Sequence, residues 1–117
     1  MAEVLALVDD VFFQSKLVES AKQVGVELRT CATAEALEEQ LSGGTPRLVI
    51  VDLNARGNPI EALRRVQTMG SDIRLIAYLS HVQTDLAERA RAAGCSEVMP
   101  RSKFTRELAT ILSRAKS

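Results

Sequence analysis

The sequence is poor in aromatic residues and carries no excess of charge. Phenylalanine, tyrosine and tryptophan make up 3% of its 117 residues, with Tyr78 the single tyrosine and no tryptophan. Proteins that bind single-stranded nucleic acid stack bases on aromatic side chains, so binding of that kind is not expected. The 15 basic and 15 acidic residues give a formal net charge of zero. This balance provides no electrostatic signal for a direct nucleic-acid partner or an anionic membrane.

Export and membrane signals are also missing. The first apolar run, Val4 to Val8, is short and ends at Asp9 and Asp10, which does not fit a signal peptide. No stretch has the length needed to span a bilayer. The two cysteines, Cys31 and Cys95, lack the spacing of a metal or redox pair. We therefore expect a cytoplasmic protein in which both thiols are reduced and semi-buried.

The sequence does contain five short apolar runs that alternate with five segments of helical period. The runs cover residues 4–8, 26–30, 48–51, 73–79 and 97–99. The first, third and fourth are almost continuously hydrophobic, as in central parallel strands covered on both faces. The second alternates and the fifth is very short, which is typical of edge strands. The pattern predicts an α/β fold: a doubly wound, five-stranded parallel sheet with right-handed crossovers.

Helix start and stop signals support these segments. Thr33 is expected to cap the second helix and Ser102 the fifth, and glycines at 25, 43–44, 70 and 94 are expected to end the first four. No linker or repeat divides the chain, and the last helical segment runs almost to Ser117. We therefore expect one domain over residues 1–117, without a separate effector domain.

Polar residues follow four of the five predicted strands. Asp9 and Asp10 come after the first strand, Asp52 after the third, Ser80 and His81 after the fourth, and Arg101 and Lys103 after the fifth. Ligands of doubly wound sheets bind beyond the carboxyl ends of the strands. These side chains are therefore the candidates for a functional site.

Three converging carboxylates must either take up protons or recruit a cation. Oxygen ligands in an incomplete protein cage favour Mg²⁺ over Ca²⁺. An aspartate beside such an ion can attack a phosphoryl group. Other interpretations stay open: Asp9 and Asp10 could end a strand and cap a helix, Ser80 could be a helix cap, and Arg101 could be an ion-paired surface residue. A functional role is favoured for Asp52, because burying a lone carboxylate after a buried strand costs free energy.

Four sequence blocks resemble the receiver domains of bacterial two-component signalling. They are VLALVDD (residues 4–10), LVIVDLN (48–54), LIAYLS (75–80) and GCSEVMPRSKF (94–104), and their separations match the family within a few residues. The resemblance covers essentially the whole chain. It implies the flavodoxin-like strand order 2-1-3-4-5, with Cys31 and Cys95 on or beside opposite edges of the sheet.

The resemblance also implies roles for individual residues. Asp52 would be the phosphoacceptor, and Asp10, Asp52 and the backbone carbonyl of Asn54 would bind Mg²⁺ directly, with Asp9 acting through water. Ser80 would be the switch hydroxyl. The phosphoryl group would come from a histidine kinase, a phosphotransfer protein or a small phosphodonor. A downstream protein would bind the fourth helix, fifth strand and fifth helix. Such a domain is not an enzyme, beyond possible self-phosphorylation on Asp52.

Several positions depart from the family pattern. Arg101 stands at the family lysine, Ser102 at the following proline and Val98 at the aromatic switch position. Arginine is larger and planar, so it is not an equivalent point charge. Lys103 would fill the lysine position only if the loop lengthened by two residues. His81 replaces a small residue and could control access to the site or titrate near neutral pH, although a partly exposed turn histidine is the commoner case.

Two functions therefore stay open. The chain is either a stand-alone receiver that accepts phosphate on Asp52, or a degenerate receiver that binds proteins without phosphorylation. The intact acidic residues favour the first, whereas Arg101, Ser102 and Val98 favour the second. A nucleotide-binding flavodoxin-like domain is disfavoured, because no glycine-rich loop follows the first strand.

Overall fold

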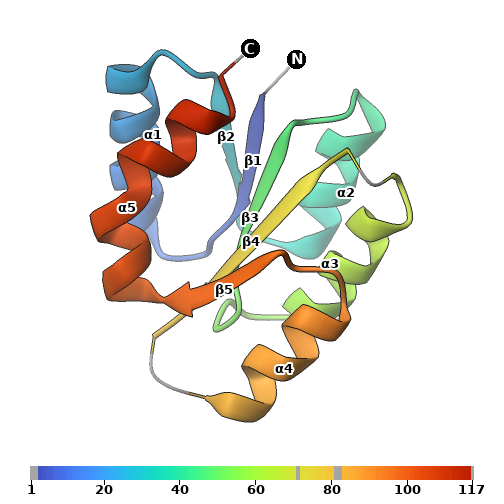
Figure 1. The fold of residues 1–117 in the computed structure, drawn as a ribbon. Helices are drawn as coiled ribbons and strands as arrows, with labels where there is room; N and C mark the ends of the chain where they lie inside the picture. The colour runs from blue at the N-terminus through green and yellow to red at the C-terminus, as the bar shows by residue number, and fades with distance from the viewer. Residues whose placement is uncertain (1–2, 71, 81–82, 117) are drawn as a thin grey trace.

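The computed structural model describes residues 3–70, 72–80 and 83–116, and its five strands form one parallel sheet with the order β2-β1-β3-β4-β5 (Figure 1). The elements are β1 (Val4–Leu7), α1 (Val11–Val24), β2 (Leu28–Cys31), α2 (Ala34–Ser42), β3 (Leu48–Asp52), α3 (Pro59–Gln67), β4 (Arg74–Leu79), α4 (Thr84–Ala92), β5 (Glu97–Pro100) and α5 (Arg101–Arg114). The predicted fold class and strand order are confirmed. Among the described helices, none combines the length and apolarity that crossing a membrane requires.

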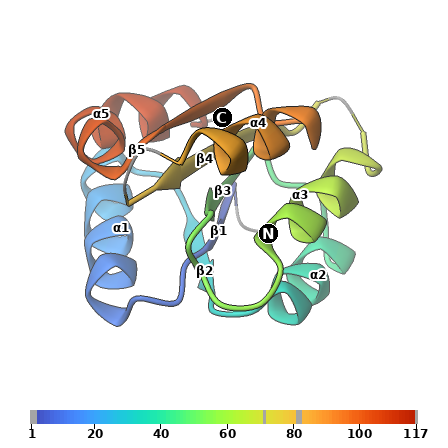
Figure 2. The ribbon, with the colours of Figure 1, turned by 90° about the horizontal axis from the view of Figure 1, so that it is seen from below.

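The helices form a layer on each side of the sheet. Helices α1 and α5 cover one face, and α2, α3 and α4 cover the other (Figures 1 and 2). Because alternate residues of a strand point to opposite faces, β1 places Val4 and Ala6 in the core under α1 and α5, and Leu5 and Leu7 in the core under the other helices. A strand buried on both faces needs apolar residues throughout, which explains the continuous hydrophobic runs.

Strand β2 lies two residues later than expected at its start, and one later at its end. Val26 is buried but does not pair with β1, where the first partners are Val4 and Leu28. Its N–H donates to the carbonyl of Ala21, as does the N–H of Gly25, whose φ of 89° turns the chain at the end of α1. The residues after α1 thus close the helix before the strand can begin.

Helix caps agree with the sequence pattern at Thr33 and differ at Ser102. The Thr33 hydroxyl accepts the N–H of Ala36 at 3.1 Å at the start of α2. The expectation for Ser102 was wrong, because α5 begins at Arg101 and the cap position belongs to Pro100, without a side-chain cap bond. Strand β5 runs directly into α5, which leaves no loop residue to serve as a cap.

The two cysteines lie at opposite sides of the sheet. Cys31 ends the edge strand β2, and Cys95 lies two residues before the other edge strand, β5. Both are buried and free, and burial raises the pKa of each thiol, that of Cys95 to about 12. The expectation that they lie on or beside opposite edges of the sheet is confirmed.

Candidate functional site

The candidate residues gather beyond the carboxyl ends of the central strands, the end of the sheet that Figure 2 faces. Asp9 and Asp10 connect β1 to α1, and Asp52 is the last residue of β3. Ser80 follows β4, and Arg101 follows β5. His81, predicted to control access to the site, lies outside the described residues.

Asp52 is a buried carboxylate. Among the described residues, Asp52 is the single polar or charged residue that is buried, with 6% of its surface exposed. One carboxylate oxygen, Oδ1, accepts the backbone N–H of Asn54 at 2.8 Å. Burial raises the pKa of Asp52, and the charges of Asp9 and Asp10 raise it further, against the opposing effects of the Asn54 bond and the Arg101 charge. The three carboxylates are therefore electrostatically coupled.

Asp10 combines two of the roles considered from the sequence. Its Oδ1 accepts the N–H of Phe12 at 2.9 Å and of Phe13 at 3.3 Å, which caps α1. Its Oδ2 accepts a hydrogen bond from Nη2 of Arg101 at 3.1 Å. The Arg101 bond is the largest of the effects that lower the pKa of Asp10. The charged form of Asp10 is therefore stabilised by both a helix end and a guanidinium.

Asp9 is paired with Arg56, a partner that sequence reasoning missed. Asp9 Oδ2 accepts the backbone N–H of Arg56 at 2.9 Å and its side-chain Nε at 3.2 Å. Arg56 lies in the loop between β3 and α3. This loop is at the carboxyl end of the parallel sheet, the same end as the loop that contains Asp9. A basic residue in that loop was the available signal, but a separation of 47 positions hides the pairing.

Arg101 lies against Phe13 as well as Asp10. Its Cζ lies 4.2 Å from the centroid of the Phe13 ring, within the range of a cation–π contact. Because α5 begins at Arg101, the loop has no extra residues that would bring Lys103 to this position. Lys103 is exposed on α5, and no ion pair joins it to another described residue. The cation beside Asp10 is Arg101.

The side chain of Asn54 links three segments of the site. Its Oδ1 accepts the backbone N–H of Ser80 at 2.7 Å, and its Nδ2 donates to Oε1 of Gln83 at 2.8 Å. Ser80 is exposed and does not cap α4, whose cap position is Gln83. Asn54 thus connects Asp52 to the chain that leads into α4.

Comparisons with known proteins agree with this architecture. No family model matches the chain. It is 25% identical over 115 residues to the DNA-binding transcriptional regulator NtrC of Azospirillum brasilense, an alignment that covers 97% of this chain and 24% of that protein. The chain thus spans about a quarter of the length of this relative.

Solved structures show the same fold. The chemotaxis response regulator CheY4 of Vibrio cholerae matches with a TM-score of 0.83 and 18% identity, covering 99% of both chains. A response regulator from Thermotoga maritima matches with a TM-score of 0.81 and 14% identity, covering 96% of this chain and 94% of the other. NtrX from Brucella abortus, in complex with ADP, matches with a TM-score of 0.82 and 19% identity, covering 97% of this chain and 26% of the other.

This chain has the fold of a response-regulator receiver domain. The four sequence blocks and the strand order agree with that assignment over residues 3–70, 72–80 and 83–116. The receiver fold accounts for the position of Asp52 at the end of the central strand. It does not by itself account for the two arginines that hold the loop aspartates.

The carboxylates at this end of the sheet suit a hard divalent cation, although the described residues are not arranged as a ready-made metal site. Their donor atoms are carboxylate oxygens, which Mg²⁺ prefers, and the Arg101 guanidinium shows that a cation is accommodated beside Asp10. Within the part of the chain that the structure describes, no group of three or more acidic, histidine or cysteine side chains is arranged to hold a metal. Instead of a metal ion, Arg56 pairs with Asp9 and Arg101 pairs with Asp10.

Val98, which the family resemblance aligns with the aromatic switch position, lies half-buried on β5. A cavity of about 200 Å³ lies beside it, between α4 and β5, with a mostly apolar lining that includes Leu79, Ala87 and Met99. Valine lacks the ring with which an aromatic side chain would alternate between this space and solvent.

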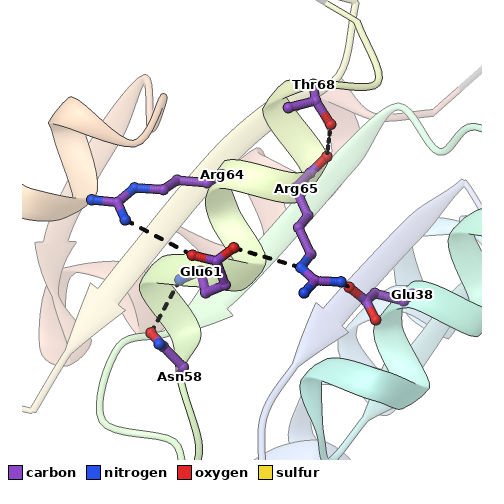
Figure 3. A network of polar contacts seen from close by, with 6 residues as sticks. All are labelled: Glu38, Asn58, Glu61, Arg64, Arg65 and Thr68. Atoms are coloured by element: carbon purple, nitrogen blue, oxygen red, sulfur yellow. Dashed lines mark hydrogen bonds and ion pairs between the residues drawn. The ribbon is translucent and has the colours of Figure 1, made fainter.

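A second cavity, of about 350 Å³, lies between the starts of α2 and α3 and is lined by Asp9 and Arg56 among others. Figure 3 shows the polar network beside it, in which Arg65 of α3 contacts Glu61 on its own helix and Glu38 on α2. Asn58 caps α3 by accepting the N–H of Glu61 at 3.1 Å. Since these charges are partly exposed and mutually paired, we interpret the network as a structural link between the two helices.

Proposed function

We propose that this chain is a receiver domain of two-component signalling that accepts a phosphoryl group on Asp52. The observation that carries the proposal is the buried carboxylate of Asp52 at the end of β3, flanked by the loop carboxylates and by Arg101. A buried carboxylate under mutual repulsion is costly unless it serves a purpose. Binding a cation and a phosphoryl group would be such a purpose.

In the proposed reaction a carboxylate oxygen of Asp52 attacks phosphorus and forms an acyl phosphate. The bond that breaks joins phosphorus to the donor: the imidazole nitrogen of a histidine kinase or phosphotransfer protein, or an oxygen of a small phosphodonor. The departing group keeps the bonding electrons and takes up a proton from solvent. The reaction is a self-modification, so we do not class the chain as an enzyme.

Asp10, Asp52 and the backbone carbonyl of Asn54 are the residues that would hold Mg²⁺ directly, with Asp9 acting through water. When bound, the ion would neutralise charge on the transferring oxygens. Arg101 supplies a permanent positive charge beside the same carboxylates. Ser80 is placed at the end of β4, where its hydroxyl could contact the phosphoryl group.

The proposed output is altered binding of a downstream protein at α4, β5 and α5. The edge strand β5, with helices on either side of it, forms one side of the molecule (Figures 1 and 2). The apolar cavity beside Val98 lies on this side. We propose that the domain acts in the cytoplasm; its stand-alone action remains a prediction, since the NtrC relative is about four times as long.

The test is phosphorylation with a small phosphodonor in the presence of Mg²⁺, followed by intact mass. We expect the mass to rise by one phosphoryl group in the wild type and to stay unchanged in Asp52→Asn. Beryllium fluoride with Mg²⁺ should shift the NMR signals of residues around Asp52. No adduct in the wild type, together with no response to beryllium fluoride, would contradict phosphorylation.

A second candidate function is a degenerate receiver that binds proteins without phosphorylation. The specific observations that favour it are the pairs Arg101–Asp10 and Arg56–Asp9, which occupy two of the carboxylates, and Val98 at the switch position. This candidate predicts that Asp52→Asn leaves partner binding unchanged. Phosphorylation that alters partner binding would exclude it.

A further inference from the structure

Both carboxylate oxygens of Asp10 already accept hydrogen bonds. Its Oδ1 accepts two backbone N–H groups of α1, from Phe12 and Phe13. A carboxylate oxygen offers about two lone-pair positions, so this oxygen is fully used. The other oxygen, Oδ2, accepts the Arg101 hydrogen bond at 3.1 Å. A cation that binds Asp10 at Oδ2 must therefore share this oxygen with the guanidinium or displace it.

Arg101 is held in that place from two sides. It is the first residue of α5, and its guanidinium carbon lies 4.2 Å from the centre of the Phe13 ring. Phe13 is buried, with 4% of its surface exposed, so the ring is a fixed surface. The same short segment of α1 thus positions both the carboxylate, through its cap, and the arginine, through the ring.

Arg56 holds Asp9 less firmly. Asp9 Oδ2 accepts one hydrogen bond from the backbone N–H of Arg56 and one from its Nε, but 91% of the Arg56 side chain is exposed. Exposed ion pairs contribute little, because solvent screens them and ordering a long side chain costs entropy. The two arginines should therefore differ in how strongly they oppose a metal.

We infer that Arg101 is a built-in counterion that competes with divalent cations for Asp10 and sets the metal affinity of the site, with Arg56 a weaker competitor at Asp9. This inference rests on the proposed metal-dependent function of the same carboxylates. Both the lost ion pair and the repulsion between the guanidinium and the incoming ion oppose binding. Metal binding at Asp10 and the Arg101–Asp10 contact therefore oppose each other.

The experiment measures Mn²⁺ binding by the electron paramagnetic resonance of free Mn²⁺, with Mg²⁺ as competitor. The variant is Arg101→Met, which keeps an unbranched side chain over Phe13 and donates no hydrogen bond. The matched control is Arg106→Met, which removes the same charge from an exposed position of the same helix. We expect Arg101→Met to bind Mn²⁺ about three- to tenfold more tightly than the wild type, from the removed pair and repulsion. Arg56→Met should produce a smaller gain and Arg106→Met almost none.

The outcomes separate this inference from the proposed function. Binding by the wild type that Arg101→Met fails to improve, or improves no more than Arg106→Met, would overturn the inference and leave the metal site standing. Binding by Arg101→Met alone would support the inference in its strongest form. If neither protein binds Mn²⁺, both the inference and the metal-dependent function are wrong.

A second measurement uses the wild type and does not depend on the variant folding. In ¹⁵N-labelled protein, the Nε signal of Arg101 should shift when Mg²⁺ saturates the site, because the incoming ion weakens or replaces the contact between the guanidinium and Asp10. The signal of Arg106 should stay in place. An unchanged Arg101 signal at saturating Mg²⁺ would contradict the competition.

Discussion

Asp52 is the residue at which stability and proposed function oppose each other. Its carboxylate is buried at the end of β3, and both its burial and the charges of Asp9 and Asp10 raise its pKa. A raised folded-state pKa means that the native protein binds a proton more readily than the unfolded chain. The charged form of Asp52 therefore destabilises the metal-free fold.

Replacing Asp52 with asparagine should stabilise the metal-free protein. The amide oxygen can still accept the Asn54 N–H, while the repelled charge is removed. We expect a gain of roughly 1 kcal/mol in the free energy of unfolding at neutral pH, measured by urea denaturation with EDTA present. Glu39→Gln, which neutralises an exposed carboxylate on α2, should change it by less than about 0.5 kcal/mol.

The gain should depend on pH with a defined sign. Below the unfolded-state pKa both states carry a protonated Asp52, so the difference from asparagine disappears. As pH rises through the window up to the raised folded-state pKa, the wild type loses stability and the gain of Asp52→Asn grows to its full value. A gain that is constant with pH, or that shrinks as pH rises, would show that the pKa of Asp52 is not raised in the folded protein.

At the scale of elements, local sequence signals predict most of the architecture. Continuous apolar runs identify the central strands, Thr33 identifies a helix start, and Gly25 a helix end, because each depends on neighbouring residues. Strand β2 and the start of α5 are less predictable. The N–H of Val26 bonds to the end of α1 and is not used in the sheet, which delays the start of β2. Strand β5 passes directly from Pro100 into α5, which sets the start of that helix.

The sequence predicts which side chains gather at the candidate site, but not the contacts that they make. The topology of parallel strands brings Asp9, Asp10 and Asp52 to one end of the sheet, and the apolar pattern already specifies that topology. The pair of Arg101 with Asp10 joins positions separated by 91 residues, and depends on how far two side chains reach. No local pattern carries that information.

The loop before α4 is coupled to Asp52 through Asn54. Asn54→Ala would remove the acceptor of the Ser80 N–H and the donor to Gln83 while leaving its own backbone bond to Asp52. The loss of one hydrogen bond predicts amide hydrogen exchange at Ser80 that is about two- to tenfold faster.

The matched control truncates another loop asparagine. Asn58→Ala should cost about 1 kcal/mol of stability, because Asn58 caps α3. It should leave the exchange rate of Ser80 unchanged under conditions in which that amide exchanges by local opening. Equal acceleration in both variants would mean that the Ser80 amide opens only with the whole fold, and that Asn54 has no local role.

At the scale of the molecule, the sheet separates two hydrophobic cores of different character. The core under α1 and α5 contains the aromatic cluster of Phe13, Tyr78 and Phe104, in which the rings of Tyr78 and Phe104 stack at 4.7 Å. The core under the other helices is aliphatic and contains both cysteines. The strands contribute side chains to both cores, so we expect the two to unfold together.

Tyr78 offers a test of that cooperativity. Its side chain is fully buried, burial raises the pKa of its hydroxyl, and the hydroxyl oxygen has no hydrogen-bond partner among the described residues. Tyr78→Phe removes this buried unsatisfied group and keeps the stacked ring. We therefore expect an increase of about 1 kcal/mol in the free energy of unfolding, measured by circular dichroism in urea.

The cysteines report on the opposite core in the same variant. If the molecule unfolds as one unit, and thiol labelling of buried Cys31 and Cys95 requires that unfolding, a gain of 1 kcal/mol should slow labelling about fivefold. Both thiols should slow equally, although neither lies in the core that contains Tyr78. A higher circular dichroism midpoint with unchanged labelling would show that the aliphatic core opens by itself, and would contradict the prediction of a single domain. The shared sheet is the physical reason to expect the cooperative result, since no helix layer can retain its core once the strands separate.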